Sequence, residues 1–362
     1  MGPLASFLDP EGPEGNEFGL REWAGTREQH AARGALAVAM EITVVIASRP
    51  NVPPEEEMRT AVVADRLGYR DLWVGEGFVW DAFALATAAG LATERIALTV
   101  GPIPVSVRDP ASIARAAAST AALVRRPVGV ALGTSSVRVV ERMHGRSRRR
   151  AVATMAESAQ ALRALFRGEV ADFAGEMVST HDYRLRLDPP GGPITLAAFG
   201  DRAIAVAAEH ADRMVLDLVS PELARGYREK LDAAARRAGR PAPKLAAWIP
   251  AAVEPTAEAR TQVLRSVVGY LEVAGYGEMF TAAGLGDAVR MAAAGADRDA
   301  LLAALPPDAA DRLGLVGDVD TVRARLDAYA AAGLDEVVLV PATEGDPGGE
   351  RTLTALAACA PR

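Results

Sequence analysis

Tyr69-Arg-Asp-Leu-Trp-Val-Gly-Glu-Gly-Phe-Val-Trp-Asp81 combines a short apolar run with a polar and aromatic end. Leu72 to Val74 is typical of a strand that is buried on both faces. Glu76, Phe78 and Trp80 come just after the carboxyl end of this predicted strand. Ligands of α/β folds bind at that end of the strands, so the loop from Glu76 onward is a candidate site.

The same unit of helix, strand and loop recurs along the chain. The predicted strands are Ile42 to Ala47, Leu72 to Val74, Ile96 to Val100, Val128 to Leu132, Ile194 to Ala198, Met214 to Leu218, Leu245 to Ala252 and Val337 to Val340. Helical runs lie between them, such as the one that Pro53 and Pro54 open and Gly68 ends. Eight strands alternating with helices predict an α/β protein with a (β/α)8 TIM barrel. A doubly wound open sheet is the alternative, but no Gly-x-Gly-x-x-Gly follows the first strand.

Several segments depart from this repeat. Residues 1–39 are predicted to be an irregular N-terminal extension, with a weak helix over 20–37, which is either a loose leader or an arm that packs on a partner subunit. The barrel is expected over 40–345. It has predicted insertions at about 168–192, read as a hairpin, and 275–314, read as short helices long enough for a lid. Residues 346–362 are expected to hold a C-terminal helix.

Composition narrows the class of protein. The 362 residues carry a net charge of -7 and are half hydrophobic, which suits a large core and argues against nucleic acid as a partner. A single cysteine, Cys359, excludes an intrachain disulfide and fits a reducing compartment. No run approaches the ~18 apolar residues of a membrane span, and no secretory signal is evident, so we expect a cytoplasmic protein without membrane contact. The four histidines lack metal-site spacing, so no metal site is predicted.

Six motifs, in the same order, resemble those of the bacterial luciferase-like flavin and deazaflavin enzymes. They are Ala64 to Glu76 (ADRLGYRDLWVGE), Ala92 to Leu98 (ATERIAL) with Pro104 and Arg108-Asp-Pro110, Met155 to Gly168 (MAESAQALRALFRG), Asp172 to Glu176 (DFAGE), Pro193 to Arg202 (PITLAAFGDR) and Gly317 to Arg325 (GDVDTVRAR). The resemblance implies a (β/α)8 barrel that binds FMN or coenzyme F420 at its C-terminal mouth. It implies either an F420-dependent oxidoreductase that transfers a hydride or a two-component monooxygenase that uses FMNH2. The motifs favour the F420 branch.

In the resembled family, the cofactor ring lies against the second, third and fourth strands, and many members have a bulge with a non-proline cis peptide there. The matching residues of this chain are Val100, Gly101 and Pro102. A cis bond before proline costs about 0.5–1 kcal/mol, against about 2.5–4 kcal/mol before other residues. We therefore predict a cis or strained peptide between Val100 and Pro102. An ordinary Gly-Pro turn at the end of the strand is the alternative.

Two turns are candidates for holding the rest of the cofactor. Thr134, Ser135 and Ser136 follow the fourth strand, where their hydroxyls and amides could bind the ring edge or the ribityl chain, or cap a helix. The second turn lies between the fifth strand and its helix and suits a phosphate, because Gly lets backbone amides approach an anion at a helix N-terminus. It consists of Phe199, Gly200, Asp201 and Arg202, of which Asp201 is better explained as a helix cap.

The segment Arg142 to Arg150 contains five arginines together with His144. A poly-anionic F420 tail would need such positive charge, whereas an FMN tail would not. The alternative is an ordinary solvated basic turn.

Glu76 and Trp80 are the candidate catalytic residues. In hydride-transferring relatives, the second strand often ends in an acid followed by His, with a Trp nearby, and some relatives place a Glu after the fourth strand. In this chain Gly77 replaces the His, and Ser135 or Ser136 stands where that Glu would be. Glu76 could donate a proton, or it could hold the barrel mouth through hydrogen bonds. The missing His also leaves open a non-catalytic barrel that binds a flavin.

The remaining expectations concern partners. Phe78, Trp80 and Trp248 could form an apolar wall for a small organic substrate, although core packing explains Trp248 equally well. The resemblance implies a homodimer. It also implies a flavin reductase as a partner if the cofactor is FMN.

Overall fold

The computed structural model describes residues 40–46, 48, 52–273 and 276–359. The predicted extension over residues 1–39, with its weak helix, lies outside the described residues. So does Ala47, the last residue of the first predicted strand.

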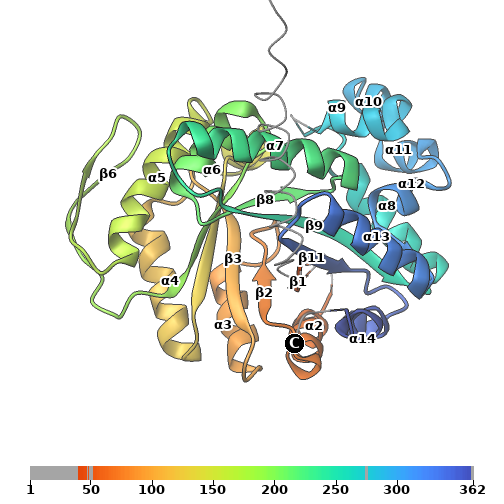
Figure 1. Ribbon diagram of the computed structural model, residues 1–362, viewed down its shortest axis with the longest axis horizontal. Helices are drawn as coiled ribbons and strands as arrows, with labels where there is room; N and C mark the ends of the chain where they lie inside the picture. Colours follow the sequence, from red (N-terminus) through yellow and green to blue (C-terminus); the bar gives the residue numbers. More distant parts are fainter. Residues whose placement is uncertain (1–39, 47, 49–51, 274–275, 360–362) are drawn as a thin grey trace, which may run out of the picture. The chain divides into compact units, whose positions relative to one another are not determined.

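Eight parallel strands close into a barrel (Figure 1). β11 pairs with β1, for example through Val338 and Thr43, so the two ends of the sheet meet. The predicted (β/α)8 barrel is confirmed. The strands are β1 (Glu41–Ile46), β2 (Asp71–Val74), β3 (Ala97–Pro104), β4 (Val128–Gly133), β7 (Gly191–Ala197), β8 (Arg213–Asp217), β9 (Lys244–Val253) and β11 (Glu336–Pro341).

Helices cover the outside of the strands (Figure 1). Proline opens α2, α4 and α7, and Gly68 ends α2 in the left-handed conformation, as predicted. The helix after β9 ends at Val268, directly before Gly269, a poor helix former. These helices are α2 (Pro54–Leu67), α3 (Ala82–Leu91), α4 (Pro110–Val124), α5 (Ala151–Phe166), α6 (Asp201–His210), α7 (Pro221–Arg237), α8 (Ala257–Val268), α13 (Val319–Ala331) and α14 (Glu350–Ala357).

The first insertion is the predicted hairpin, made of β5 (Ala171–Ala174) and β6 (Ser179–Tyr183). It is fixed to α5 by Glu157, whose carboxylate accepts the backbone N–H of Met177 at 2.7 Å and of Val178 at 2.8 Å. The described part of the second insertion consists of short helices, also as predicted. They are α9 (Gly277–Phe280), η2 (Thr281–Leu285), α10 (Gly286–Ala293), α11 (Arg298–Ala304) and α12 (Ala309–Leu313).

Three short elements were not predicted from the sequence. The π-helix η1 (Arg138–Met143) replaces part of the expected Arg-rich turn. The strand β10 (Leu315–Gly317) adds to the carboxyl end of β9, and the 3-10 helix η3 (Pro347–Gly349) precedes α14. Across the part of the chain that the structure describes, no helix is both long and apolar enough to cross a lipid bilayer.

The barrel interior contains charged residues beneath an apolar layer. The interior charged cluster consists of Asp71, Arg213 and Glu336, the first residues of β2, β8 and β11. Arg213 contacts Glu336 at 2.6 Å and Asp71 at 3.3 Å, and its guanidinium lies 4.2 Å from the ring centre of Trp73. Above the cluster, buried apolar side chains fill the barrel. They are Val45, Trp73, Ala131, Val215, Ala246 and Val338.

Threonine hydroxyls and the Trp73 indole N–H also donate to the interior charged cluster, whereas Asp71 Oδ1 has no partner among the described residues. Thr99 donates to Asp71 at 2.7 Å and Thr43 donates to Glu336 at 2.7 Å. Burial raises the pKa of Asp71, which the charge of Arg213 opposes. The cluster joins three strands that are far apart in the sequence, so it helps to fix which strands face one another.

Candidate functional site

The candidate ring wall lies where β3 and β4 end. The register between these strands shifts between Val100 and Ile103, and the Gly101–Pro102 bond is cis, which confirms the prediction for this stretch. Gly101 has φ 119°, a conformation that favours glycine. A Cβ placed on Gly133 would lie 3.1 Å from Pro102 and 3.7 Å from Ala197 of β7. The ends of three strands therefore meet closely at this wall.

Glu76 is held on both sides of its carboxylate. Its Oε1 pairs with Arg108 at 3.0 Å, and its Oε2 accepts the backbone N–H of Ala82 at 3.0 Å. Arg108 also binds Asp81, which caps α3. Burial of Arg108 disfavours its charge, but the hydrogen bond that it donates to Asp81 and the charges of the Glu76 and Asp81 carboxylates raise its pKa above the ordinary value. Glu76 thus fastens the loop after β2 to the loop after β3, which favours its positioning role.

We expect Glu76→Gln to destabilise the protein by about 1–3 kcal/mol, because the Gln removes a charge-assisted bond and leaves Arg108 with one fewer partner. Urea denaturation measures the change. Glu229→Gln, on the exposed face of α7, is the matched control and should stay within about 0.5 kcal/mol. Equal stability of the two variants would rule out a positioning role for Glu76.

Trp248 forms part of the floor of the mouth. Its ring packs edge-on against Trp73 with 5.7 Å between ring centres, and a Cβ on Gly75 would lie 3.3 Å from it. The indole N–H groups of Trp248 and Trp80 are both buried, and neither has a hydrogen-bond partner among the described residues. Buried donors are nearly always paired in native proteins, and these two N–H groups could donate to the acceptors of a ligand. Trp80, a predicted catalytic residue, is therefore better placed as a binding residue.

The residue that sequence reasoning missed is Asp217, the half-buried last residue of β8. The Tyr276 hydroxyl lies 3.3 Å from its Oδ2, and Tyr270 hydrogen-bonds the same side chain. Burial raises the pKa of Asp217 to about 7. The nearby charge of Asp217 raises the pKa of Tyr270, and burial raises that of Tyr276. A carboxylate that directly follows the apolar run Met214 to Leu216 was the available sequence signal.

The turn after β4 is braced from within the basic segment. Arg148 Nε donates to the carbonyl of Ser135 at 2.8 Å, and its Nη2 donates to the Thr134 hydroxyl at 3.2 Å. Ser136 Oγ accepts the backbone N–H of Val139 at 3.3 Å, so it caps the following helical turn. Sequence reasoning did not single out Arg148, because its partners depend on how the turn folds back.

The loops after β4 and β2 also touch one another. The guanidinium of Arg138 lies 5.1 Å from the ring centre of Phe78, which is otherwise exposed. This contact brings a predicted substrate-wall residue next to the start of η1. His144, in contrast, is exposed at the end of η1. Within the described residues it contacts none of the other predicted site residues.

The turn between β7 and α6 leaves a helix N-terminus open. Gly200 is the N-cap of α6, makes no side-chain cap, and has no atom within 4 Å of its Cβ position. Asp201 was expected to cap the helix, and this expectation is wrong. Gly200 occupies the N-cap position, and Asp201 instead pairs with Lys230 at 2.9 Å on the surface. Arg202 is exposed, and Phe199 packs against Tyr276 with ring centres 4.9 Å apart. An anion could approach the open backbone amides here.

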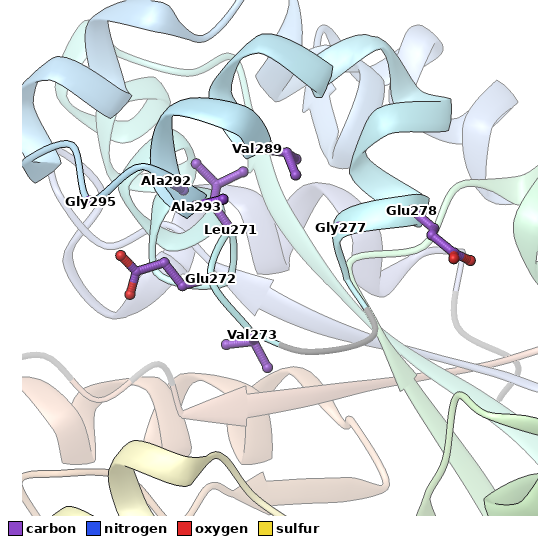
Figure 2. A pocket seen from close by; sticks show the side chains of 9 residues that line it. All are labelled: Leu271, Glu272, Val273, Gly277, Glu278, Val289, Ala292, Ala293 and Gly295. Atoms are coloured by element: carbon purple, nitrogen blue, oxygen red, sulfur yellow. The ribbon is translucent and has the colours of Figure 1, made fainter.

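A separate cavity of about 740 Å³ lies between the segment after α8 and the helices of the second insertion (Figure 2). Its two carboxylates, Glu272 and Glu278, point to opposite sides, so they form no common site (Figure 2). None of its lining residues comes from a strand end, and we place no chemistry in it. The lining residues are Leu271, Glu272, Val273, Gly277, Glu278, Val289, Ala292, Ala293 and Gly295.

Comparisons with known proteins agree with the barrel fold. A protein of Mycobacterium tuberculosis, provisionally named a coenzyme F420-dependent oxidoreductase, is 24% identical over 335 residues, covering 84% of this chain and 95% of that protein. The F420-dependent tetrahydromethanopterin reductase of Methanopyrus kandleri superposes with a TM-score of 0.72 at 16% identity, covering 88% of this chain and 97% of the other.

A second solved structure binds a different cofactor. The oxygenating constituent of 3,6-diketocamphane monooxygenase from Pseudomonas putida, in complex with FMN, superposes with a TM-score of 0.65 at 17% identity. It covers 88% of this chain and 97% of the other. These two structures share the fold. The model of the luciferase-like monooxygenase family matches residues 27–336, most of the chain. The chain therefore belongs to the luciferase-like monooxygenase family.

Proposed function

We propose that the protein is an F420-dependent oxidoreductase that transfers a hydride between the deazaflavin and a small organic substrate. Family membership and the F420-dependent name of the mycobacterial relative support this proposal. The relatives include both F420 and FMN enzymes, so the choice between the cofactors has to come from this chain's own residues.

The observation that favours F420 over FMN is the unpaired positive charge of the basic segment, Arg142 to Arg150. Arg142, Arg146 and Arg149 are exposed, and their guanidinium groups have no partner in the part of the chain that the structure describes. Arg148 and Arg150, in contrast, bind Thr134 and Glu176. The three unpaired groups suit a long poly-anionic tail such as that of F420, because each could neutralise one carboxylate. The single phosphate of FMN does not require them.

The mouth also fits the ring and phosphate that the two cofactors share. The unpaired indole N–H groups of Trp80 and Trp248 suit the carbonyl and nitrogen acceptors of the ring. Val100 to Pro102 and Thr134 to Ser136 would form its walls, and the open amides after Gly200 would hold the phosphate. When bound, the cofactor supplies the hydride chemistry. The chain's residues orient it and exclude water.

Cofactor titration tests the proposal. We expect the purified protein to bind oxidised F420 tightly. The triple variant Arg142→Ser/Arg146→Ser/Arg149→Ser should weaken F420 binding about 10- to 100-fold, because three charge-assisted contacts of the order of 1 kcal/mol are lost. FMN binding should stay within about threefold. Raising the salt concentration should weaken F420 binding to the wild type more than to the variant.

The matched control is Arg225→Ser/Arg237→Ser/Arg323→Ser, which removes three exposed arginines from α7 and α13. Tight binding of FMN alone would overturn the proposal and indicate oxygen chemistry with a flavin reductase. If neither cofactor bound below about 1 mM, roughly -4 kcal/mol, the protein would be a barrel without this cofactor chemistry.

A further inference from the structure

We propose that Asp217 exchanges a proton with the substrate at the barrel mouth and that Tyr270 and Tyr276 hold its carboxyl group in position. The inference rests on the proposed hydride transfer and adds to it the group that handles the proton. Nothing in the sequence resemblance assigned a role to any of these three residues.

The strand pattern places Asp217 inside the mouth. Successive side chains of a strand point to opposite faces, and two earlier residues of β8, Arg213 and Val215, both lie in the barrel interior. Asp217 follows in the same alternation at the carboxyl end of the strand. It pairs in register with Trp248, the floor residue whose indole N–H is unpaired. Asp217 therefore lies beside the residues that fit the ring.

The surroundings of Asp217 differ from those of Glu76. Glu76 is neutralised by Arg108 and uses both oxygens in fixed contacts. The groups that act on Asp217 within the described residues are the two tyrosines and the backbone of Leu218, none of which carries a positive charge. Burial therefore keeps the pKa of Asp217 near 7, where the protonated and ionised forms are both present at neutral pH. A general acid or base works best in that range.

The tyrosines act as fixed donors. The pKa of each is raised, so both stay protonated at neutral pH. Tyr276 is itself packed between Tyr270, 5.0 Å away between ring centres, and Phe199 at 4.9 Å. Phe199 in turn packs on Tyr227 of α7, the next titratable group outward. Their packing holds the hydroxyls, and hence the carboxyl of Asp217, in one place.

For a substrate with a carbonyl conjugated to a carbon–carbon double bond, Asp217 is the proton donor. The reduced deazaflavin of the proposed function would supply a hydride, with its electron pair, to the substrate carbon. The O–H bond of Asp217 breaks as an O–H or C–H bond forms on the substrate, and the electron pair stays on the carboxylate. Water at the partly exposed side of Asp217 returns the proton. For a secondary alcohol the same steps run in reverse, and the carboxylate accepts the hydroxyl proton.

Asp217→Asn tests the inference, because the amide oxygen still accepts from the tyrosines but the side chain carries no acidic proton. Infrared difference spectra of the wild type, taken without cofactor, should show a carboxyl that titrates near pH 7 and is absent in Asp217→Asn. Turnover of a panel of enones and secondary alcohols with F420 should fall about 10²- to 10⁴-fold in kcat. KM and F420 affinity should change less than about threefold, since only the proton step is removed.

Further variants separate this role from a structural one. Asp217→Glu should restore part of kcat and a pH midpoint in the infrared titration of the carboxyl group. The control Asp327→Asn, on the exposed face of α13, should leave kcat and that midpoint unchanged. If Asp217→Asn kept the wild-type kcat and pH profile, or if no wild-type carboxyl titrated near pH 7, the inference would be wrong. If the wild type did not bind F420, the proposed function would be wrong. The infrared titration would still show whether the carboxyl of Asp217 titrates near pH 7.

Discussion

Arg213→Met is expected to destabilise the protein by about 3–5 kcal/mol, because it leaves two carboxyl groups buried without a positive partner. Arg213 and Glu336 have only 7% and 0% of their side-chain surfaces exposed. Arg213 bonds to Glu336, Asp71, Thr99 and Thr195, so its loss breaks four contacts at once. Denaturation in urea at neutral pH measures the change.

The penalty of Arg213→Met should also depend on pH. Without Arg213, the folded-state pKa of Asp71 rises further above that of the unfolded chain, because burial disfavours its charged form and the opposing positive charge is gone. Folding then binds a proton, so the stability of the variant is highest at low pH and is lost as the pH rises through the folded-state pKa of Asp71. The loss of stability relative to the wild type should therefore be smaller at about pH 5 than at about pH 8.

Two controls separate charge from packing. Arg323→Met, on the exposed face of α13, should stay within about 0.5 kcal/mol of the wild type. The triple variant Asp71→Leu/Arg213→Met/Glu336→Leu removes all three charges together and should recover most of the loss, because no charge is left unpaired. If Arg213→Met were as stable as Arg323→Met, the interior charged cluster would have no stabilising role.

The sequence predicted the barrel because each strand carries its signal locally. Apolar runs such as Val128 to Leu132 indicate strands without knowledge of their neighbours, and Pro and Gly mark where helices begin and end. The interior charged cluster has no such signal. Arg213 and Glu336 are 123 positions apart, and only closure of the barrel brings them together. β10 was missed because three residues are too short for a recognisable pattern.

The same distinction applies to the candidate site. The loops after β2, β4 and β7 were predicted because the carboxyl ends of parallel strands meet at one mouth. The partners within the mouth could not be predicted, since Glu76 and Arg108 are 32 positions apart and Asp217 and Tyr276 are 59 apart. Asp201 was misjudged because a local rule favoured Asp as a cap, whereas the N-cap position lies one residue earlier, at Gly200, and Asp201 is the first residue of the helix. Its pairing with Lys230 depends on how α6 lies beside α7.

Gly101→Ala is the second variant with a large expected effect, on both stability and cofactor binding. A Cβ on Gly101 would lie 2.3 Å from the carbonyl oxygen of Ala131 and 2.6 Å from the backbone nitrogen of Ile103. Both atoms belong to paired strands, so neither can move away without disturbing the sheet. The φ of 119° adds backbone strain for any residue with a side chain. Together these effects should cost about 3–5 kcal/mol.

Gly77→Ala is the matched control that lets Gly101→Ala test cofactor binding as well as stability. Gly77 lies in the same mouth but has no atom within 4 Å of its Cβ position, so its substitution should change stability by less than about 1 kcal/mol. If the bulge of β3 forms the ring wall, any Gly101→Ala protein that remains folded at low temperature should bind F420 more weakly by at least about tenfold, since the wall has shifted. Gly77→Ala should keep its affinity within about threefold. A folded Gly101→Ala protein with wild-type affinity for F420 would place the cofactor ring elsewhere in the mouth. Trp80 and Trp248 would then be the next residues to substitute, because their unpaired indole N–H groups do not depend on the bulge of β3.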